Sequence, residues 1–194
     1  MTRILVLAGS NRTGSLNRRL ADEAVGLLAA SQAVEVVRLD LADYPLPIYD
    51  GDVEAASGLP DAALKLAGQL TASDAALLVS PEYNASVPPL LKNALDWASR
   101  VRRLDNRPVL PFRGLVVGLA SASPGRFGGA RSLSHLRDIL VSLGSEVIAR
   151  QCSIVQAGEA FDAEGRLSRP NDRDALEKLV ESLVDIAIAL RRAG

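Results

Sequence analysis

The sequence has one cysteine, Cys152, and one histidine, His135, among its 194 residues. A single cysteine excludes a disulfide within the chain, and these two residues are too few for a zinc or iron–sulfur site. Aromatic residues make up only 4% of the chain, which disfavours a base-stacking surface for single-stranded nucleic acid. We therefore expect no metal site, and we predict structural rather than catalytic roles for Cys152 and His135.

Excess charge of one sign and long apolar runs are also missing. Lys and Arg number 22 against 23 Asp and Glu, which gives a net charge of −1, so nucleic acid and anionic membranes are poor candidate partners. No run approaches the roughly 20 apolar residues of a membrane span, and the N-terminal apolar stretch is too short for a secretory signal. We expect a cytoplasmic protein with a single domain, residues 1–194, in which 48% apolar residues supply the core.

Short apolar runs alternate with amphipathic segments along the whole chain. Strands are predicted at 3–8, 34–39, 75–80 and 115–121, with a weaker one at 146–150. Three of them are nearly continuous in Val, Leu and Ala, as in parallel strands that are buried on both faces. Helices are predicted at 15–30, 88–101, 131–143 and about 171–192. Residues 40–60, with three prolines and four aspartates, are predicted to form an irregular surface loop.

This alternation predicts a flavodoxin-like α/β fold. Five parallel strands in the order 2-1-3-4-5 would form a doubly wound sandwich with helices on both faces. In that order the first and third strands are neighbours, and ligands bind in the crevice at their carboxyl ends. The loops after these two strands are therefore the first places to look for a site.

The loop after the first predicted strand, residues 9–17, reads GSNRTGSLN. Its glycine spacing is that of a nucleoside-triphosphate loop, but Ser15 stands where the phosphate-binding lysine should be. Asn11 replaces the middle glycine of the dinucleotide motif. What remains is a site for a terminal phosphate monoester, with donors from Ser10, Arg12, Thr13, Ser15 and Asn17. The alternative is a simple helix start with Ser15 as N-cap and Arg12 in solvent.

Two further loops would share that crevice. SPEYNASVPP (80–89) follows the third strand and combines stiffening prolines with the aromatic face of Tyr83 and the amide of Asn84. These features suit a flat, amide-edged ring such as the isoalloxazine of FMN. SASPGRFGGAR (121–131) follows the fourth strand, and its glycines would let backbone amides reach the edge of the ring. Gly128, Gly129 and Ala130 are also suited to open the next helix.

Together these stretches resemble the NADPH-dependent FMN reductase family, and within it the chromate/quinone reductase branch. The markers are GSNRTGSLN, PEYNASVPPLLKNALDW and GGARSLSHLR, and the match covers nearly the whole chain. The resemblance implies an oxidoreductase that passes two electrons from NADPH or NADH through bound FMN, by a ping-pong mechanism. The acceptor would be a quinone, free flavin, chromate, azo compound or ferric chelate, and no side chain would be catalytic.

The resemblance also implies the cofactor contacts. Ser10, Arg12, Ser15, Leu16 and Asn17 would bind the FMN phosphate; Pro81, Glu82, Tyr83 and Asn84 would hold the ring and ribityl chain; and Ser121, with its neighbours through Gly125, would close over the ring edge. Members of the family are homodimers or homotetramers, which would place Trp97 at or near a subunit interface. Taken by itself, Trp97 is more typical of a core residue.

Several questions stay open at the level of the sequence. A flavodoxin-like electron carrier would bind the same cofactor without oxidising NAD(P)H, although such carriers are usually strongly acidic. A non-enzymatic α/β binding module would use the crevice for another phosphate. Arg100 and Arg126 are predicted to be solvated, although Arg126 could instead steer NAD(P)H or an anionic acceptor. The sequence favours neither NADH nor NADPH.

Overall fold

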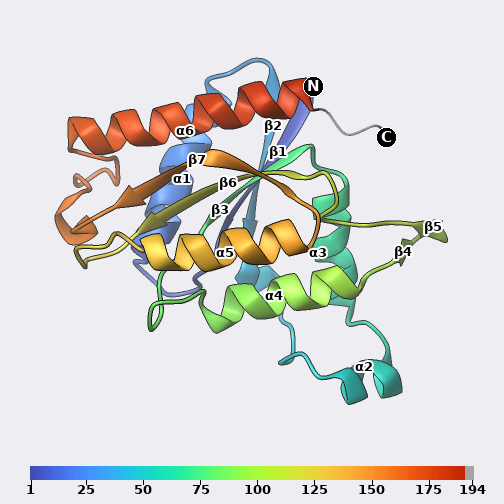
Figure 1. Cartoon of the computed structure of the whole chain (residues 1–194). Helices are drawn as coiled ribbons and strands as arrows, with labels where there is room; N and C mark the ends of the chain where they lie inside the picture. The colour runs from blue at the N-terminus through green and yellow to red at the C-terminus, as the bar shows by residue number, and fades with distance from the viewer. Residues whose placement is uncertain (191–194) are drawn as a thin grey trace.

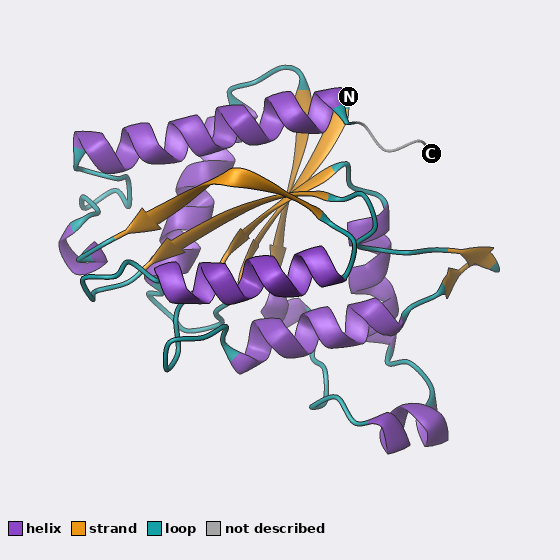
Figure 2. Ribbon diagram, in the orientation of Figure 1, coloured by secondary structure: helices purple, strands orange, loops and turns teal. Residues whose placement is uncertain are grey.

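The computed structural model describes residues 1–190, which fold around a five-stranded sheet (Figures 1 and 2). The sheet has the order β2-β1-β3-β6-β7, and every neighbouring pair is parallel. Its strands are β1 (Thr2–Ala8), β2 (Val34–Asp40), β3 (Ala75–Val79), β6 (Val116–Ala122) and β7 (Glu146–Ile154). The predicted flavodoxin-like order is confirmed, and the weak strand predicted at 146–150 is longer than expected.

Helices cover both faces of this sheet (Figure 2). One face carries α1 (Leu16–Ala29) and α6 (Pro170–Ala189), and the other carries α3 (Asp61–Thr71), α4 (Pro89–Arg100) and α5 (Ala130–Ser142). Strand β1 shows why both faces are needed, because Ile4 and Val6 belong to one apolar core and Leu5 to the other. All three are fully buried, as expected for a central parallel strand.

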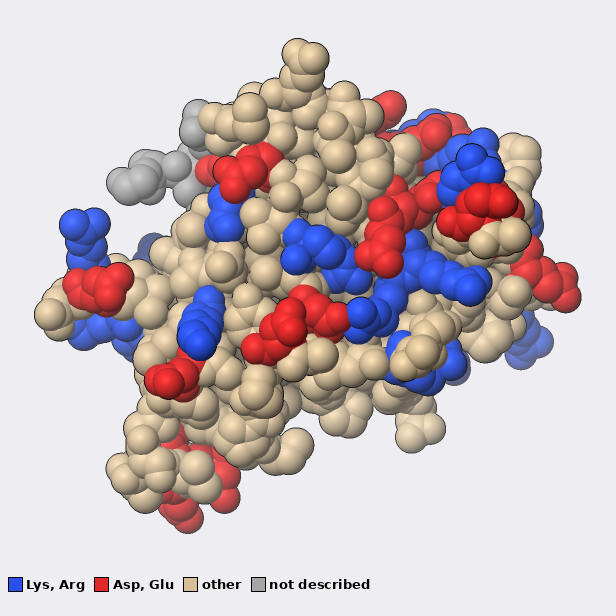
Figure 3. Space-filling model, turned by 180° about the vertical axis from the view of Figure 1, so that it is seen from behind, with Lys and Arg blue, Asp and Glu red and all other residues tan. Residues whose placement is uncertain are grey.

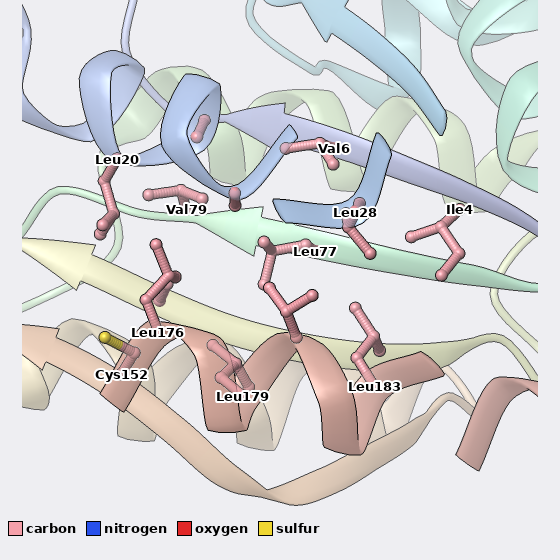
Figure 4. Packing of buried hydrophobic residues seen from close by; sticks show 14 of the residues in the cluster. Ile4, Val6, Leu20, Leu28, Leu77, Val79, Cys152, Leu176, Leu179 and Leu183 are labelled. Atoms are coloured by element: carbon pink, nitrogen blue, oxygen red, sulfur yellow. The ribbon is translucent and has the colours of Figure 1, made fainter. Parts of the chain in front are cut away.

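Figure 4 shows the core between the sheet and α6, where leucines from the helix point toward Leu77 of β3. The leucines of α6 in this core are Leu176, Leu179 and Leu183, and all are fully buried. Cys152 of β7 lies in the same core with 1% of its surface exposed. Burial, and secondarily the negative charge of Asp172, raises the pKa of its thiol to about 12, so the predicted structural role of Cys152 is confirmed.

The segment predicted as an irregular loop, residues 40–60, contains two short helices, so that part of the prediction is wrong. They are η1 (Leu41–Asp43) and α2 (Gly51–Ser57). Aspartates start both: the side chain of Asp40 accepts a hydrogen bond from the Ala42 backbone, and that of Asp50 accepts one from Asp52. Two of the four aspartates in this segment, Asp40 and Asp50, are therefore helix caps.

Arg100 was predicted to be solvated, but the structure shows that it fastens α2 to α4. Its guanidinium donates to both carboxylate oxygens of Glu54, at 2.9 and 3.1 Å. The Tyr49 hydroxyl donates to the same carboxylate at 2.9 Å. None of the residues of α2 is buried, so these polar contacts hold a helix that has no apolar anchor of its own.

Trp97 is a core residue, as its type by itself predicted. Its side chain is fully buried, its Nε1 donates to the Pro47 carbonyl at 2.7 Å, and the Tyr49 ring meets it edge-on with centroids 5.0 Å apart. The indole therefore offers no surface to a partner subunit. Any contribution of α4, the helix that contains Trp97, to a subunit interface would come from its exposed residues.

Three further elements differ from the predictions. Helix α3 was missed, although Ala63, Leu66, Ala67 and Leu70 recur with helical spacing and are all buried. The short hairpin of β4 (Arg103–Leu104) and β5 (Arg107–Pro108) was also missed. Helix α6 begins at Pro170 with Arg169 as its N-cap, not at the following Asn-Asp pair. Its predicted end at residue 192 lies outside the described residues.

On the face seen in Figure 3, basic and acidic side chains alternate. This mixture matches the nearly neutral net charge. Within residues 1–190, no helix has the length and hydropathy needed to span a bilayer.

Candidate functional site

The loops after β1, β3 and β6 meet at the carboxyl edge of the sheet and enclose a cleft of about 270 Å³. Its lining residues are Ser10, Arg12, Ser15, Leu16, Asn17, Pro81, Glu82, Tyr83, Ala122, Ser123 and Pro124. The first eight are residues that the sequence assigned to a site, and the structure brings them together. Asn84, Ser121 and Gly125 do not line the cleft.

A second hollow of about the same volume lies among the ends of α4 and α5 and includes Ser99, Arg102 and Gly144. Helix carboxyl ends present carbonyl oxygens and partial negative charge. Arginines line both hollows, but the first cleft adds the amino end of α1 to its arginine, which favours anion binding there.

The β1–α1 loop offers several donors that are not engaged within the chain. Ser15 occupies the N-cap position of α1, but its side chain makes no capping hydrogen bond, and the first turn of the helix has no acidic residue. The hydroxyl of Ser15 and the first N–H groups of the helix thus keep their donors for a ligand. Within residues 1–190, no carboxylate forms an ion pair with Arg12. This geometry favours a phosphate loop over a simple helix cap.

Asn17 joins two sides of the cleft. Its side-chain oxygen accepts from the Ala122 backbone N–H at 2.9 Å, and its Nδ2 donates to the Ala122 carbonyl at 2.8 Å. With 3% of its surface exposed, it ties the start of α1 to the end of β6. Asn17, which the sequence predicted to contact the phosphate, is thus also a structural bridge. One hydrogen of its side-chain amide remains available to a bound group.

The β3–α4 loop forms a tight turn that presents an aromatic ring. Backbone hydrogen bonds of 3.0 Å run in both directions between Tyr83 and Ser86, while Asn84 and Ala85 at the tip have φ of 49° and 65°. Asn84 suits this left-handed conformation. Tyr83 is 47% exposed and lines the cleft, whereas Asn84 lies at the tip of the turn.

Glu82 fastens this loop to α5. Its carboxylate accepts hydrogen bonds from the backbone N–H groups of Arg131 and Ser132, and from Arg131 Nε at 2.8 Å. Burial raises the pKa of Glu82, but the hydrogen bonds and positive charge of Arg131 and the Ser132 N–H outweigh it, so the pKa lies below its usual range. The carboxylate therefore stays ionised and holds two loops of the site together.

We expect Glu82→Gln to remove part of the acid sensitivity of the fold. Because the pKa of Glu82 is lower in the folded chain, its carboxylate stabilises the fold fully above the ordinary glutamate pKa of about 4.3, and this contribution is lost as the pH falls further. The free energy of unfolding of the variant should be lower at pH 7, and the difference from wild type should shrink at pH 3. Urea titrations at both values would measure this.

The control for this prediction is Glu164→Gln. The ion pair of Glu164 with Arg166 is exposed to solvent, and such pairs contribute little. An equal effect of both variants, or a difference for Glu82→Gln that persists at pH 3, would contradict the prediction.

The β6–α5 loop differs in detail from what the sequence suggested. Ser121 is fully buried, and it lies beneath Gly129, whose notional Cβ would fall 1.8 Å from the Ser121 Oγ. Gly125 is exposed on the outer side of the loop. Because successive residues of a strand point to opposite faces, Ala122 faces the cleft side and Ser121 faces α5. This alternation was readable in the sequence and would have selected Ala122, whereas Ser123 follows the end of β6 and lines the cleft from the loop.

His135 and the glycine pair complete the surroundings of the cleft. His135 is exposed on α5, and its Nδ1 lies 3.0 Å from the Ser86 Oγ, so it supports the β3–α4 loop as a structural residue. Gly129 is the N-cap of α5, with φ of 84°, which confirms that the glycine pair opens this helix.

Comparison with known proteins identifies the family to which the chain belongs. The sequence profile of a family described as NADPH-dependent FMN reductase matches residues 2–159. The chain belongs to the NADPH-dependent FMN reductase family.

Individual relatives agree with the NADPH-dependent FMN reductase assignment. An NAD(P)H-dependent FMN reductase of Pseudomonas aeruginosa is 39% identical over 183 residues, which cover 93% of this chain and 92% of the relative. A quinone reductase of Escherichia coli K12 is 41% identical over 145 residues, 75% of this chain and 72% of the relative. The structure of a flavoenzyme NAD(P)H:(acceptor) oxidoreductase from Paracoccus denitrificans has a TM-score of 0.80 and 29% identity, covering 97% of this chain and 98% of that one.

Membership of the NADPH-dependent FMN reductase family decides between the classes left open by the sequence. The chain is a flavin-dependent NAD(P)H oxidoreductase, neither a pure electron carrier nor a non-enzymatic binding module.

Proposed function

We propose that this chain binds FMN in the cleft and uses it to carry two electrons from NADPH or NADH to a small-molecule acceptor. The observation that carries the proposal is the pairing of two features in one cleft. A phosphate-type loop with uncommitted donors lies on one side, and the exposed ring of Tyr83 lies on the other.

The residues present fit this cofactor. A phosphate monoester needs several N–H and O–H donors and a positive charge, which Ser10, Ser15, the amino end of α1 and Arg12 supply. A flat ring needs an apolar face and a rigid seat, which Tyr83 and Pro81 supply. When bound, FMN supplies the acceptance and release of a hydride, which no side chain can perform.

The protein's own contribution is positioning. Asn17 and Glu82 hold the three loops at fixed separations, so the seat does not have to be organised when ligand enters. We further propose ping-pong kinetics, in which the nucleotide leaves the cleft before the acceptor enters it. Quinones, free flavin, chromate, azo compounds and ferric chelates are the acceptors we propose to assay.

An absorbance spectrum before and after anaerobic addition of NADPH, and then NADH, tests the proposal. Flavin bands that bleach would support it, and subsequent addition of a quinone should restore them. A yellow protein that neither nucleotide bleaches would contradict the proposed reductase activity. A colourless protein that also fails to bind added FMN would contradict the cofactor assignment.

We expect Arg12→Ala to weaken FMN binding about tenfold or more, because a charge-assisted hydrogen bond contributes about 1.5–3 kcal/mol. The rate of flavin reduction at full occupancy should change little, since Arg12 would contact the phosphate and not the ring. Fluorescence titration of flavin-free protein with FMN would measure the affinity.

Arg19→Ala is the matched control for this prediction. It removes the same charge from the exposed surface of α1, and Arg19 does not line the cleft. Equal losses in both variants would reduce the role of Arg12 to general electrostatics. Full flavin occupancy in Arg12→Ala would contradict its assignment to the phosphate.

We also propose a homodimer or homotetramer in the cytoplasm, as the family resemblance implies. Light scattering coupled to gel filtration would measure the mass.

A further inference from the structure

An aromatic ring flanked by two arginines stands next to the cleft, on the β6–α5 loop. Phe127 is 50% exposed, and the guanidinium carbons of Arg126 and Arg131 lie 4.8 and 4.7 Å from its ring centroid. Both distances fall within the range of a cation–π contact. The ring thus gives two long side chains defined positions in an otherwise exposed loop.

The backbone of this loop is anchored at the rim of the cleft. The carbonyl of Ser123 accepts from the Ala157 N–H at 2.9 Å, and that of Gly125 accepts from the Gln156 N–H at 3.2 Å. Ser123 and Pro124 line the cleft, and Arg126 follows two residues later. In Figure 1 this loop, between β6 and α5, runs at the same end of the sheet as the loop between β3 and α4.

The two arginines differ in what they are bound to. Arg131 is committed to Glu82, through its backbone and its guanidinium. Arg126 is exposed, and within residues 1–190 no carboxylate forms an ion pair with it. Within residues 1–190, the guanidinium of Arg126 therefore keeps its five N–H donors free of any carboxylate and lies against the aromatic face of Phe127.

We propose that Arg126 binds the 2′-phosphate of NADPH and so sets a preference for NADPH over NADH. The inference rests on the proposed function, and it adds that the nicotinamide end of the nucleotide enters the cleft while the adenosine end extends over its rim. A planar guanidinium matches a phosphate monoester in shape and charge. The 2′-phosphate is the group that distinguishes NADPH from NADH, so a contact with it discriminates without touching the reacting atoms.

Calorimetric titration with adenosine 2′,5′-bisphosphate and with 5′-AMP tests the contact without relying on turnover. We expect wild type to bind the bisphosphate more tightly, and Arg126→Ala to lose about tenfold in that affinity while its affinity for 5′-AMP is unchanged. Arg126→Lys keeps the charge but loses the fork, so its loss should be intermediate. Arg107→Ala removes an exposed arginine from the distant β4–β5 hairpin and is the control.

Steady-state kinetics give the second readout. In Arg126→Ala the KM for NADPH should rise about tenfold, with the KM for NADH and both kcat values unchanged. A merely structural role on Phe127 would move both nucleotides alike and would overturn the proposal. So would bisphosphate binding that is unaffected by the variant, or that is no tighter than 5′-AMP binding in wild type.

Two further outcomes are informative. One distinguishes the phosphate of NADPH from that of free FMN, and the other distinguishes failure of the proposed function from failure of the role of Arg126. If Arg126→Ala raised only the KM for free FMN as acceptor, Arg126 would contact the phosphate of the acceptor, and its assignment to NADPH would be overturned. Absence of flavin reduction in wild type would contradict the proposed function, whereas the calorimetric difference between the two adenosine ligands would still decide the role of Arg126.

Discussion

Gly129→Ala is expected to lower the free energy of unfolding by about 2–5 kcal/mol, from left-handed backbone strain and overpacking together. At φ of 84°, an added Cβ would lie 1.8 Å from the Ser121 Oγ and 2.8 Å from its Cβ. Ser121 belongs to β6, an inner strand of the sheet, and is fully buried, so it has no room to move. Urea unfolding followed by circular dichroism would measure the loss.

A double variant separates the two causes. Ser121→Gly removes both contacting atoms, so combining it with Gly129→Ala should recover the packing part and leave about 1–2 kcal/mol of backbone strain. Gly158→Ala is the control, because an added Cβ there meets nothing within 4 Å. The packing argument predicts that Gly129→Ala lowers the free energy of unfolding less in the Ser121→Gly background than in wild type. Equal losses in the two backgrounds would contradict it.

Asn17→Ala should lower the free energy of unfolding by about 2–4 kcal/mol, because it strands two buried backbone groups of Ala122. Both hydrogen bonds lie in a buried setting, with 3% of Asn17 exposed. The variant should also bind FMN more weakly, since Asn17 holds the β1–α1 and β6–α5 sides of the cleft together. Urea unfolding and FMN titration would report the two effects separately.

Asn93 on α4 offers a matched control. It makes the same kind of double contact, accepting from the Tyr49 N–H at 2.8 Å and donating to the Pro47 carbonyl at 2.8 Å, but it is only half-buried. Water can replace its hydrogen bonds, so Asn93→Ala should cost only about 1 kcal/mol. Equal losses would show that burial is not what makes Asn17 important.

The sequence predicted the sheet and its strand order because the signals are local. Continuous apolar runs mark strands buried on both faces, and helices between them impose parallel pairing. The same reasoning missed α3, whose helical spacing was present, and α2, whose aspartates serve as caps. Helix α2 has no apolar face, and its contacts with Arg100 and Tyr49 come from distant or loop residues that no local pattern reveals.

By itself the sequence determined that three loops share one edge of the sheet, and that one of them has the donors of a phosphate site. Loop position follows from strand order, and donor chemistry follows from residue type. Only the tertiary structure decided which way each side chain points. It committed Glu82 to Arg131, used Asn17 as a bridge and buried Ser121 beneath Gly129, while Arg126 kept no ion-pair partner within residues 1–190. The reason is physical: a side chain's function depends on which partners already occupy its donors and acceptors, and those partners come from distant parts of the chain.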